Sequence, residues 1–375
     1  MHSPIHIIIA EPFHSGSHKS WIDGLGKFCD CDIELLALKG RHWKWRMHGG
    51  AVTLAKKLSQ SSFRPDLIIA SDMLDLPLFL AHTRHQTANV PVALYMHENQ
   101  LTYPWSPQDR DVRLKRDRHY AFTNYASALV ADKVLFNSGY HMNVFLDALP
   151  KFLKAFPDHR ELASVEAIRK KSEVLELALD LNALDIFKCP KNRKPAILWN
   201  HRWEYDKSPE DFFSVLFRLS EKGMDFDLIV LGESGDKYPV IFDEARQRLS
   251  AHILHWGYAK DAAEYAGWLW KANILPVTSR QDFFGMSTVE AMYCQCHPIL
   301  PDRLAYPGHI PHSGRNDFIY SSPEMLEHML IELVSGEKEL KGAEARSFVS
   351  RYDWKQQAST YNRMFRQLAA SPVTP

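Results

Sequence analysis

The feature that most limits how this chain can fold is the alternation of short apolar runs with longer segments of helical period. The expected strands are residues 5–10, 66–70, 91–95 and 133–136, then 197–200, 227–231, 253–256, 274–277 and 298–300. The expected helices are residues 19–28, 50–60 and 116–131, then 209–221, 238–249, 261–270 and 285–294. Alternation of this kind is typical of parallel sheets with helices on both faces, and here it occurs twice. The sequence therefore predicts an α/β protein with two Rossmann-like domains, whose ligands bind beyond the C-terminal ends of the strands.

A basic segment with two prolines marks the expected domain boundary. Residues 188–195 contain Pro190 and Pro195, which cannot continue the charged helical segment at 158–176. A chain of 375 residues also suits two domains. We expect an N-terminal domain at 1–190, a C-terminal domain at 191–350, and a final segment at 351–375 with a helix near 354–368.

Composition favours a cytoplasmic protein. The apolar run at residues 5–10 is too short to cross a membrane and lacks the flanks of a signal peptide, and no later stretch approaches a membrane span. The five Cys form no C-x-x-C pair, so neither a disulfide framework nor a zinc ribbon is indicated. We expect reduced thiols, a cytoplasmic location and no membrane partner.

Charge is unevenly distributed, although the net formal charge is zero. Residues 1–195 hold 26 Lys and Arg against 21 Asp and Glu, with 12 of the 19 His, whereas residues 196–375 hold 19 against 24. A mildly basic N-terminal half favours an anionic partner such as RNA. An ordinary solvated surface can show the same asymmetry.

The strongest chemical signal is the segment 278–290, which follows an expected strand and opens a helix at Gly285. The backbone N–H groups and positive dipole end of a helix start suit a diphosphate, and glycine lets the backbone approach a ligand closely. Asp282 precedes the helix and Glu290 lies on its second turn, so two carboxylates can hold hydroxyls at two ends of a sugar nucleotide. The alternative is a helix N-cap Asp and a surface Glu.

Two further signals follow other expected strands. Arg202 and Lys207, in the segment 200–207, can converge on a diphosphate, Arg202 as a fork and Lys207 as a point charge. The alternative is a chance arrangement on the surface. His97 lies at the C-terminal tip of a strand of the first half, where it is either a donor-site residue or a structural histidine.

Together these segments resemble the family-4 retaining glycosyltransferases of the GT-B fold, in which two Rossmann-like domains face a central cleft. That family binds its donor with Arg and Lys at this spacing and with a Glu-x7-Glu segment that has Gly three residues after the first acid. This chain has Asp282 in place of the first Glu, which shortens the reach by one methylene. The resemblance implies catalytic roles for His97, Arg202, Lys207, Asp282 and Glu290. It implies donor binding by Gly16, Ser17, Gly232, Tyr258, Ser279, Phe284, Gly285, Met286 and Ser287. It also implies that the N-terminal domain binds the acceptor, that the C-terminal domain binds the donor, and that the helix of the segment 351–375 returns toward the N-terminal domain.

The resemblance implies that no metal ion is used. GT-B enzymes use Arg, Lys and helix dipoles where GT-A enzymes use a divalent cation. The D-x-D sequence at residues 30–32 lies at a helix-to-strand turn away from the expected donor site, and we assign it to the surface. No G-x-S-x-G sequence supports a Ser–His–Asp hydrolase.

Further segments are similar to a smaller family, the queuosine-tRNA mannosyltransferases. They are residues 11–21, 39–50, 97–104, 137–141, 199–207, 276–290 and 304–307. This resemblance implies transfer of mannose from GDP-mannose to the cyclopentenediol of queuosine at the wobble position of tRNA, with no resident cofactor.

Basic and aromatic side chains alternate in segment 39–50, and a second basic group lies at 110–118. Cations suit phosphates, and aromatic faces suit unstacked bases, so we expect both groups to contact tRNA. The alternatives are a packed loop with its aromatic rings in the core between the domains and, for 110–118, a solvated helix face. The residues assigned to tRNA binding are Arg41, Trp43, Lys44, Trp45, Arg46, Lys115 and Arg116.

We therefore predict a retaining glycosyltransferase whose partners are a nucleotide sugar and a tRNA. In such a reaction the diphosphate leaves from the face that the acceptor hydroxyl attacks, so no protein nucleophile is required. One alternative is a GT-B enzyme with a small-molecule, lipid or glycan acceptor. An alternative of another class is a non-catalytic nucleotide- and RNA-binding protein.

Overall fold

The computed structural model describes residues 4–106, 109–114, 118–235 and 237–371. Contacts between residues divide the chain into two compact units. Unit 1 is Met1–Leu179 together with Trp354–Pro375, and unit 2 is Asp180–Asp353. Each unit contains one six-stranded sheet, so both are α/β structures.

The boundary between the units comes earlier in the chain than the basic, proline-containing segment that the sequence indicated. The reason is a short 3-10 helix, η1 (Leu181–Phe187), which lies before that segment and packs against α10 (Ala262–Lys271). Within this contact the indole Nε1 of Trp270 donates a hydrogen bond to Leu184 O at 2.8 Å. Unit 2 therefore begins before the prolines.

Unit 1 is built on a parallel sheet with strand order β2-β1-β3-β4-β5-β6. Side chains alternate between the two faces of a strand, so Ile8, Ile68 and Leu94 all enter one core beneath α2, α3 and α5. The strands are β1 (Ile5–His14), β2 (Cys31–Lys39), β3 (Leu67–Ser71), β4 (Val92–Met96), β5 (Lys133–Phe136) and β6 (Ser172–Val174). The helices are α1 (Gly16–Phe28), α2 (Trp43–Leu58), α3 (Leu76–Thr87), α4 (Arg110–Arg113), α5 (Arg118–Val130), α6 (Gly139–Lys154), α7 (Ala163–Lys170) and α15 (Trp354–Ala369).

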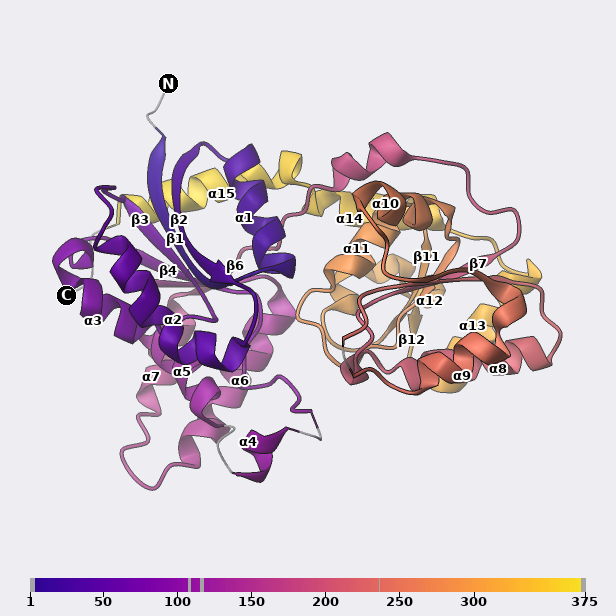
Figure 1. Ribbon diagram of the computed structural model, residues 1–375, viewed down its shortest axis with the longest axis horizontal. Helices are drawn as coiled ribbons and strands as arrows, with labels where there is room; N and C mark the ends of the chain where they lie inside the picture. Colours follow the sequence, from indigo (N-terminus) through magenta and orange to yellow (C-terminus); the bar gives the residue numbers. More distant parts are fainter. Residues whose placement is uncertain (1–3, 107–108, 115–117, 236, 372–375) are drawn as a thin grey trace. The chain divides into compact units, whose positions relative to one another are not determined.

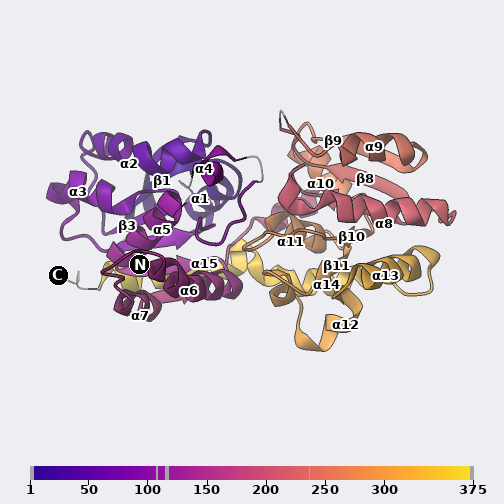
Figure 2. The same ribbon diagram turned by 90° about the horizontal axis from the view of Figure 1, so that it is seen from below.

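The last helix, α15, is part of unit 1, where it lies against α1, β1 and β3 (Figure 1 and Figure 2). A Cβ at Gly24 of α1 would stand 1.9 Å from the indole Nε1 of Trp354, so glycine is needed for the two helices to approach this closely. The hydroxyl of Tyr361 accepts a hydrogen bond from Trp21 Nε1 at 3.0 Å and donates one to Glu176 O at 2.8 Å. These contacts fix α15 to the face of the sheet opposite α2.

Unit 2 has a parallel sheet with strand order β12-β11-β10-β7-β8-β9. Figure 1 shows α10, α11 and α14 on one side of this sheet and α8, α9 and α13 on the other. The strands are β7 (Ala196–Asn200), β8 (Asp227–Leu231), β9 (Ile253–Gly257), β10 (Ile274–Pro276), β11 (His297–Pro301) and β12 (Ile319–Tyr320). The helices are α8 (Pro209–Glu221), α9 (Ile241–Arg248), α10, α11 (Met286–Tyr293), α12 (Arg315–Phe318), α13 (Pro323–Ser335) and α14 (Gly342–Val349). The remaining 3-10 turns are η2 (Tyr205–Lys207), η3 (Ser250–His252), η4 (Tyr306–His309), η5 (His312–Gly314) and η6 (Ser350–Tyr352).

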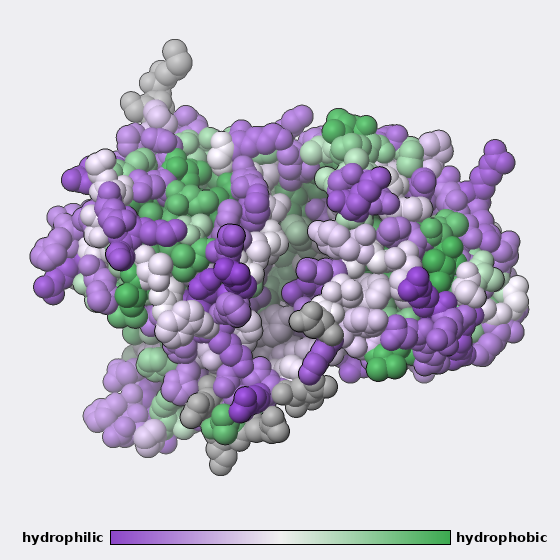
Figure 3. All heavy atoms as spheres, viewed as in Figure 1, coloured by the Kyte–Doolittle hydropathy of each residue, from purple (hydrophilic) through white to green (hydrophobic). Residues whose placement is uncertain are grey.

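Hydrophilic side chains cover most of the surface that Figure 3 shows, and hydrophobic ones form separate small patches. In the described part of the chain, no helix combines the length and the apolar character that crossing a membrane requires.

Candidate active site

Lys207 and Asp282 meet in unit 2 at the C-terminal ends of β7 and β10, which are neighbours in the sheet. The Nζ atom of Lys207 lies 3.2 Å from Asp282 Oδ2 and 3.2 Å from Asp206 Oδ2. It also donates a hydrogen bond to Gln281 O at 2.7 Å. Burial opposes the charge on Lys207, but the two carboxylates raise its pKa above the ordinary value. The two residues assigned to the donor site are thus brought together as a buried ion pair.

A tyrosine that the sequence reading did not assign holds the other side of Asp282. Tyr306, at the start of η4, donates its hydroxyl hydrogen to Asp282 Oδ2. Gly285 has a φ of 87°, and a Cβ there would lie 3.0 Å from Tyr306 Cε1, so both the backbone and the tyrosine ring require glycine. Burial opposes ionisation of Asp282, but the charge of Lys207 lowers its pKa below the ordinary value. Asp282 is therefore an ionised group with two protein partners.

Helix α11 starts directly after Gly285, as the sequence predicted. Gly285 is the N-cap residue, and no side chain caps the helix start. The alternative in which Asp282 is the N-cap residue is therefore wrong. The helix start follows the ion pair in the chain, which places a positive dipole end near a buried ammonium.

Glu290 lies on α11 among polar side chains of unit 2. Its Oε2 accepts a hydrogen bond from Tyr265 OH at 2.6 Å, and the same hydroxyl accepts one from Asn200 Nδ2 at 3.0 Å. Asn200 Nδ2 also donates to Ser287 O at 2.9 Å, which joins the end of β7 to α11. Burial raises the pKa of Glu290 to about 7. The alternative of a surface Glu is wrong, because Glu290 is partly buried and its carboxylate is oriented by Tyr265.

Arg202 differs from Lys207 in its exposure. Its side chain is 56% exposed, and its Nη1 lies 3.1 Å from Glu204 Oε1. The charge of Arg202 lowers the pKa of Lys207, which opposes the effect of the carboxylates. Arg202 is therefore a cation on the rim of the site, and Lys207 is one inside it.

The other residues of unit 2 that were assigned to the donor lie at the same edge of its sheet, in loops or in the first turn of α11. Ser279 and Phe284 are buried, Met286 and Ser287 are half-buried, and Tyr258 after β9 is 74% exposed. Gly232, after β8, has a φ of 123°, and a Cβ there would lie 2.0 Å from His201 O. The strand order β10-β7-β8-β9 makes these loops neighbours.

His201 is a further buried residue of these loops that the sequence reading did not assign. It is 5% exposed, its Nδ1 lies 3.4 Å from Ser287 Oγ, and its Nε2 has no partner in the described chain. Its position directly after Asn200, where β7 ends, is the sequence feature that could have identified it as a site residue.

In unit 1, His97 lies at the C-terminal tip of β4 and is 6% exposed. Its backbone N–H donates to Asp72 Oδ1 at 2.7 Å. Neither ring nitrogen has a hydrogen-bond partner within the described residues. Since buried polar atoms are usually paired, two unpaired nitrogens on one ring favour a functional over a purely structural histidine.

Gly16 and Ser17 form the first turn of α1, after β1. Gly16 is exposed and has a φ of 51°. Ser15, the N-cap residue, makes no side-chain capping bond. The helix start therefore lies at the same end of the unit 1 sheet as His97, because both follow the C-terminal ends of parallel strands.

The basic–aromatic segment of unit 1 is helical, because α2 begins at Trp43. Trp43 is half-buried and packs against Tyr120 and Trp105, with ring centroids 4.9 Å and 6.1 Å apart. Trp45 is 64% exposed, and its ring lies over Gly49, where a Cβ would be 2.6 Å from the indole Cζ2. The structure thus separates the two tryptophans, since Trp43 supports the fold and Trp45 faces solvent.

The cations of this segment also differ in their surroundings. Lys44 Nζ lies 2.6 Å from Asp109 Oδ1 and 2.5 Å from Asp111 Oδ2, so its charge is balanced by two carboxylates. Arg41 is exposed, and Arg46 is half-buried, with its Nε donating to Lys39 O at 3.3 Å. The two other residues assigned to tRNA, Lys115 and Arg116, lie outside the described residues.

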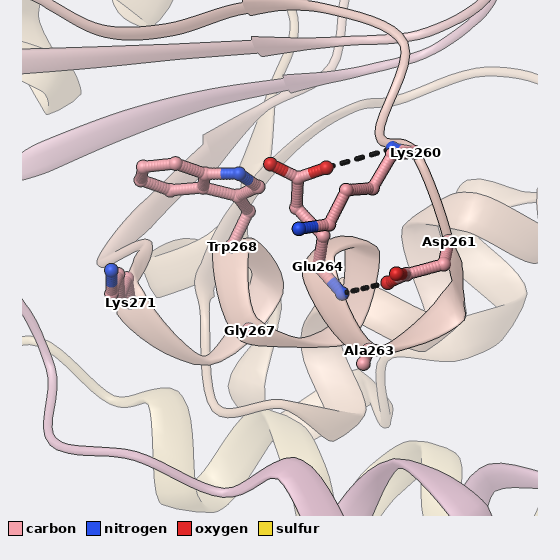
Figure 4. Close-up of a pocket in the computed structure, with 7 residues that line it drawn as sticks. All are labelled: Lys260, Asp261, Ala263, Glu264, Gly267, Trp268 and Lys271. Carbon is pink, nitrogen blue, oxygen red and sulfur yellow. Dashed lines mark hydrogen bonds between the residues drawn. The ribbon is translucent and has the colours of Figure 1, made fainter.

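A separate shallow cavity of about 350 Å³ lies beside α10 of unit 2 (Figure 4). Its lining includes Lys260, Glu264 and Trp268, and none of the residues assigned to the donor. Asp261 caps α10 by accepting the N–H of Glu264 at 2.8 Å. The cavity walls are thus charged residues that stabilise a helix start, and we assign no ligand to them.

The D-x-D sequence has a structural partner. Asp30 pairs with Arg366 of α15, and its backbone N–H donates to Asn362 Oδ1 at 2.9 Å. Over the described ranges, no three His, Cys, Asp or Glu side chains are grouped as metal ligands.

Comparison with known proteins identifies both halves of the chain. Residues 6–179 match the family described as tRNA-queuosine alpha-mannosyltransferase N-terminal, and residues 184–347 match the glycosyl transferases group 1. The tRNA-queuosine alpha-mannosyltransferase of Drosophila melanogaster is 34% identical over 313 residues, which are 80% of this chain and 81% of that protein. An uncharacterized glycosyltransferase of Methanocaldococcus jannaschii is 27% identical over 152 residues, 40% of this chain and 42% of that one.

Solved structures agree with the fold. Sucrose-phosphate synthase from Thermosynechococcus elongatus has a TM-score of 0.67 at 15% identity, over 99% of this chain and 100% of that one. The Anabaena protein HepE in complex with UDP has a TM-score of 0.65 at 15% identity, over 97% and 100%. The fold is therefore that of the GT-B glycosyltransferases, and the chain belongs to the tRNA-queuosine alpha-mannosyltransferase family.

Proposed function

We propose that this protein transfers mannose from GDP-mannose to the cyclopentenediol of queuosine at the wobble position of tRNA. The observation that carries the proposal is the 34% identity to the Drosophila enzyme over 80% of the chain. The buried cation Lys207 and the start of α11 support a diphosphate site, because both stabilise negative charge.

The proposed chemistry needs no protein nucleophile and no metal ion. The anomeric configuration is retained when the acceptor hydroxyl attacks the face from which GDP departs. Charge then develops on the leaving diphosphate, and Arg202, Lys207 and the start of α11 stabilise it. In this scheme Glu290 holds the ribose and His97 orients the sugar.

A transfer assay with two matched tRNAs tests the proposal. Purified protein is incubated with radiolabelled GDP-mannose and a tRNA carrying either queuosine or guanosine at the wobble position. We expect label only in the queuosine tRNA, with and without EDTA, because only queuosine offers the cyclopentenediol hydroxyl. Equal labelling of both tRNAs, or of neither, would exclude queuosine as the acceptor, and label in a small-molecule acceptor would favour another glycosyltransferase activity.

The raised pKa of Glu290 predicts a pH dependence of donor binding. Hydroxyls of a ribose donate to a carboxylate, so binding favours the ionised form, which predominates above the pKa of about 7. Affinity for GDP-mannose should therefore fall about tenfold between pH 8 and pH 6, as protons compete with the ribose. Calorimetry on the wild type and on Glu290→Gln measures this, and the variant should bind weakly at both pH values. The same pH dependence in both proteins would contradict the role of Glu290.

The exposure of Trp45 predicts which aromatic residue meets RNA. Trp45→Ala should weaken tRNA binding by roughly 1–3 kcal/mol with little change in its salt dependence, because base stacking releases no counterions. Arg41→Ala should instead lower the salt slope by about one, and Lys44→Ala should change it less, because Asp109 and Asp111 already balance its charge.

Binding isotherms at several salt concentrations measure these effects. Val130→Ala, which removes an apolar side chain that is 44% exposed at the C-terminal end of α5, is the control and should bind tRNA normally. Unchanged tRNA affinity in Trp45→Ala would show that this face of α2 does not contact RNA.

A further inference from the structure

The ring of His97 is held on several sides in unit 1, although its nitrogens are unpaired. His18, in the first turn of α1, stacks on it with ring centroids 4.1 Å apart and an interplanar angle of 28°. Trp21 and Tyr95 meet it edge-on, with centroids 5.2 Å and 4.8 Å away. The imidazole is therefore fixed in position by aromatic contacts, and both of its buried nitrogens lack a hydrogen-bond partner among the described residues.

His18 is itself held by a carboxylate. Its Nδ1 lies 2.7 Å from Glu11 Oε2 of β1, and the two side chains are 7% and 1% exposed. The other carboxylate oxygen of Glu11 accepts the backbone N–H of Phe13 at 2.7 Å. Glu11 is thus anchored in the chain, and it orients the His18 ring.

The charges around His18 decide which of the two stacked rings carries a proton. Burial opposes charging of His18, but Glu11 overrides it, with further contributions from Asp72 after β3 and Glu98 after β4. Together these groups raise the pKa of His18 to about 9. His18 is therefore an imidazolium at neutral pH.

His97 has the opposite surroundings. Burial lowers its pKa well below the ordinary value, and the charge of His18 lowers it further. His141 on α6 adds no charge at neutral pH, because burial lowers its own pKa to about 3. Two imidazolium rings at a stacking distance would repel each other strongly away from water. The proton of the stacked pair therefore resides on His18.

We propose that Glu11 and His18 are positioning residues that hold His97 neutral and fix the plane of its ring. A neutral imidazole offers one N–H donor and one acceptor nitrogen, whereas an imidazolium offers two donors only. A sugar hydroxyl both donates and accepts hydrogen bonds, so the neutral ring can either donate a hydrogen bond to it or accept one from it. The contact between His97 and a sugar hydroxyl rests on the proposed function, but the protonation state of His18 and His97 does not.

The test compares His18→Phe with the wild type by NMR of ¹³C-labelled histidine, titrated from about pH 5 to about pH 10. Phenylalanine keeps a flat ring against His97 and removes the charge. In the wild type we expect His97 to stay neutral throughout and His18 to titrate near the top of this range. In His18→Phe the midpoint of His97, assigned by difference from His97→Asn, should rise into this range. A His97 that stays neutral over the whole range in His18→Phe, or a wild-type His18 that is neutral at pH 7, would overturn the proposal.

Further variants separate the proposal from a packing effect. His18→Gln removes the cation with a smaller side chain and serves where His18→Phe does not fold, with the same expected rise. Glu11→Gln should lower the midpoint of His18, and His85→Gln, on the exposed side of α3, should change neither signal. The acid limb of the transfer rate should move upward in His18→Phe, to the midpoint that NMR gives for His97 in that variant. If neither the wild type nor any variant transfers mannose, the proposed function is wrong. The titration of His97 still decides the role of His18.

Discussion

Lys207→Ala is expected to remove transfer activity almost completely. The residue supplies a buried cation to the proposed diphosphate site, and removing such a group costs about 3 kcal/mol of transition-state stabilisation, on the order of a hundredfold in kcat/KM. The loss should exceed this, because Asp206 and Asp282 would remain buried without their counter-charge and would repel the anionic donor.

Comparison with two arginine variants isolates this effect. Arg202→Ala should also lower kcat/KM but should leave the melting temperature unchanged, since its side chain is 56% exposed. Arg280→Ala removes a charge that is 65% exposed and paired with Asp211, so both its activity and its stability should be near those of the wild type. Steady-state rates and thermal unfolding curves measure both quantities. Wild-type kcat/KM in Lys207→Ala and Arg202→Ala would refute the diphosphate assignment.

His97→Ala is expected to lower the transfer rate about a hundredfold while the fold and nucleotide affinity persist. A misplaced sugar costs this much when a positioning side chain is lost. The fold should survive because no described protein group depends on a hydrogen bond from the His97 ring, but the melting temperature should fall because the ring packs against three others. Transfer rates, nucleotide affinity and melting temperature are measured together, with His85→Ala as a surface control. A lowered melting temperature with full specific activity would instead assign His97 a structural role.

The fully buried strands of the sheets were predictable from sequence. The apolar runs that form β3, β7 and β8 lie within a residue of their expected bounds, because strands covered on both faces leave an uninterrupted apolar signal. The edge strand β2 was missed because its alternating charges do not form such a run, and β6 and β12 are too short to stand out.

The start of α2 shows how glycines led to a wrong prediction of where a helix begins. The helix was expected to begin at Gly50, but it already begins at Trp43. Gly49 lies within the helix because the ring of Trp45 occupies the space that a Cβ would need, and a Cβ at Gly50 would lie 2.8 Å from Pro12. Gly50 makes room for a distant segment and Gly49 for a ring one turn earlier in the same helix, and local propensity reveals neither demand.

The candidate site was predictable in its charged residues but not in their partners. Lys207, Asp282 and Glu290 stood out because they follow strands at a recognisable spacing. The tyrosines that hold the two carboxylates, Tyr306 and Tyr265, are distant in sequence and reach them only after the loops have folded. The resemblance implied that Asp282 contacts the donor. In the structure its carboxylate contacts two protein groups, Lys207 and Tyr306.

The return of α15 to unit 1 has a consequence for how the chain is synthesised. Translation proceeds from the N-terminus, so the ribosome completes the whole of unit 2 before it adds residues 354–371. Until then Trp21 and Tyr95 lack the hydroxyl of Tyr361, and the space over Gly24 is without the indole of Trp354. Unit 2 is continuous and can close first. The nascent unit 1 instead leaves an apolar strip of its sheet uncovered for the time needed to translate unit 2.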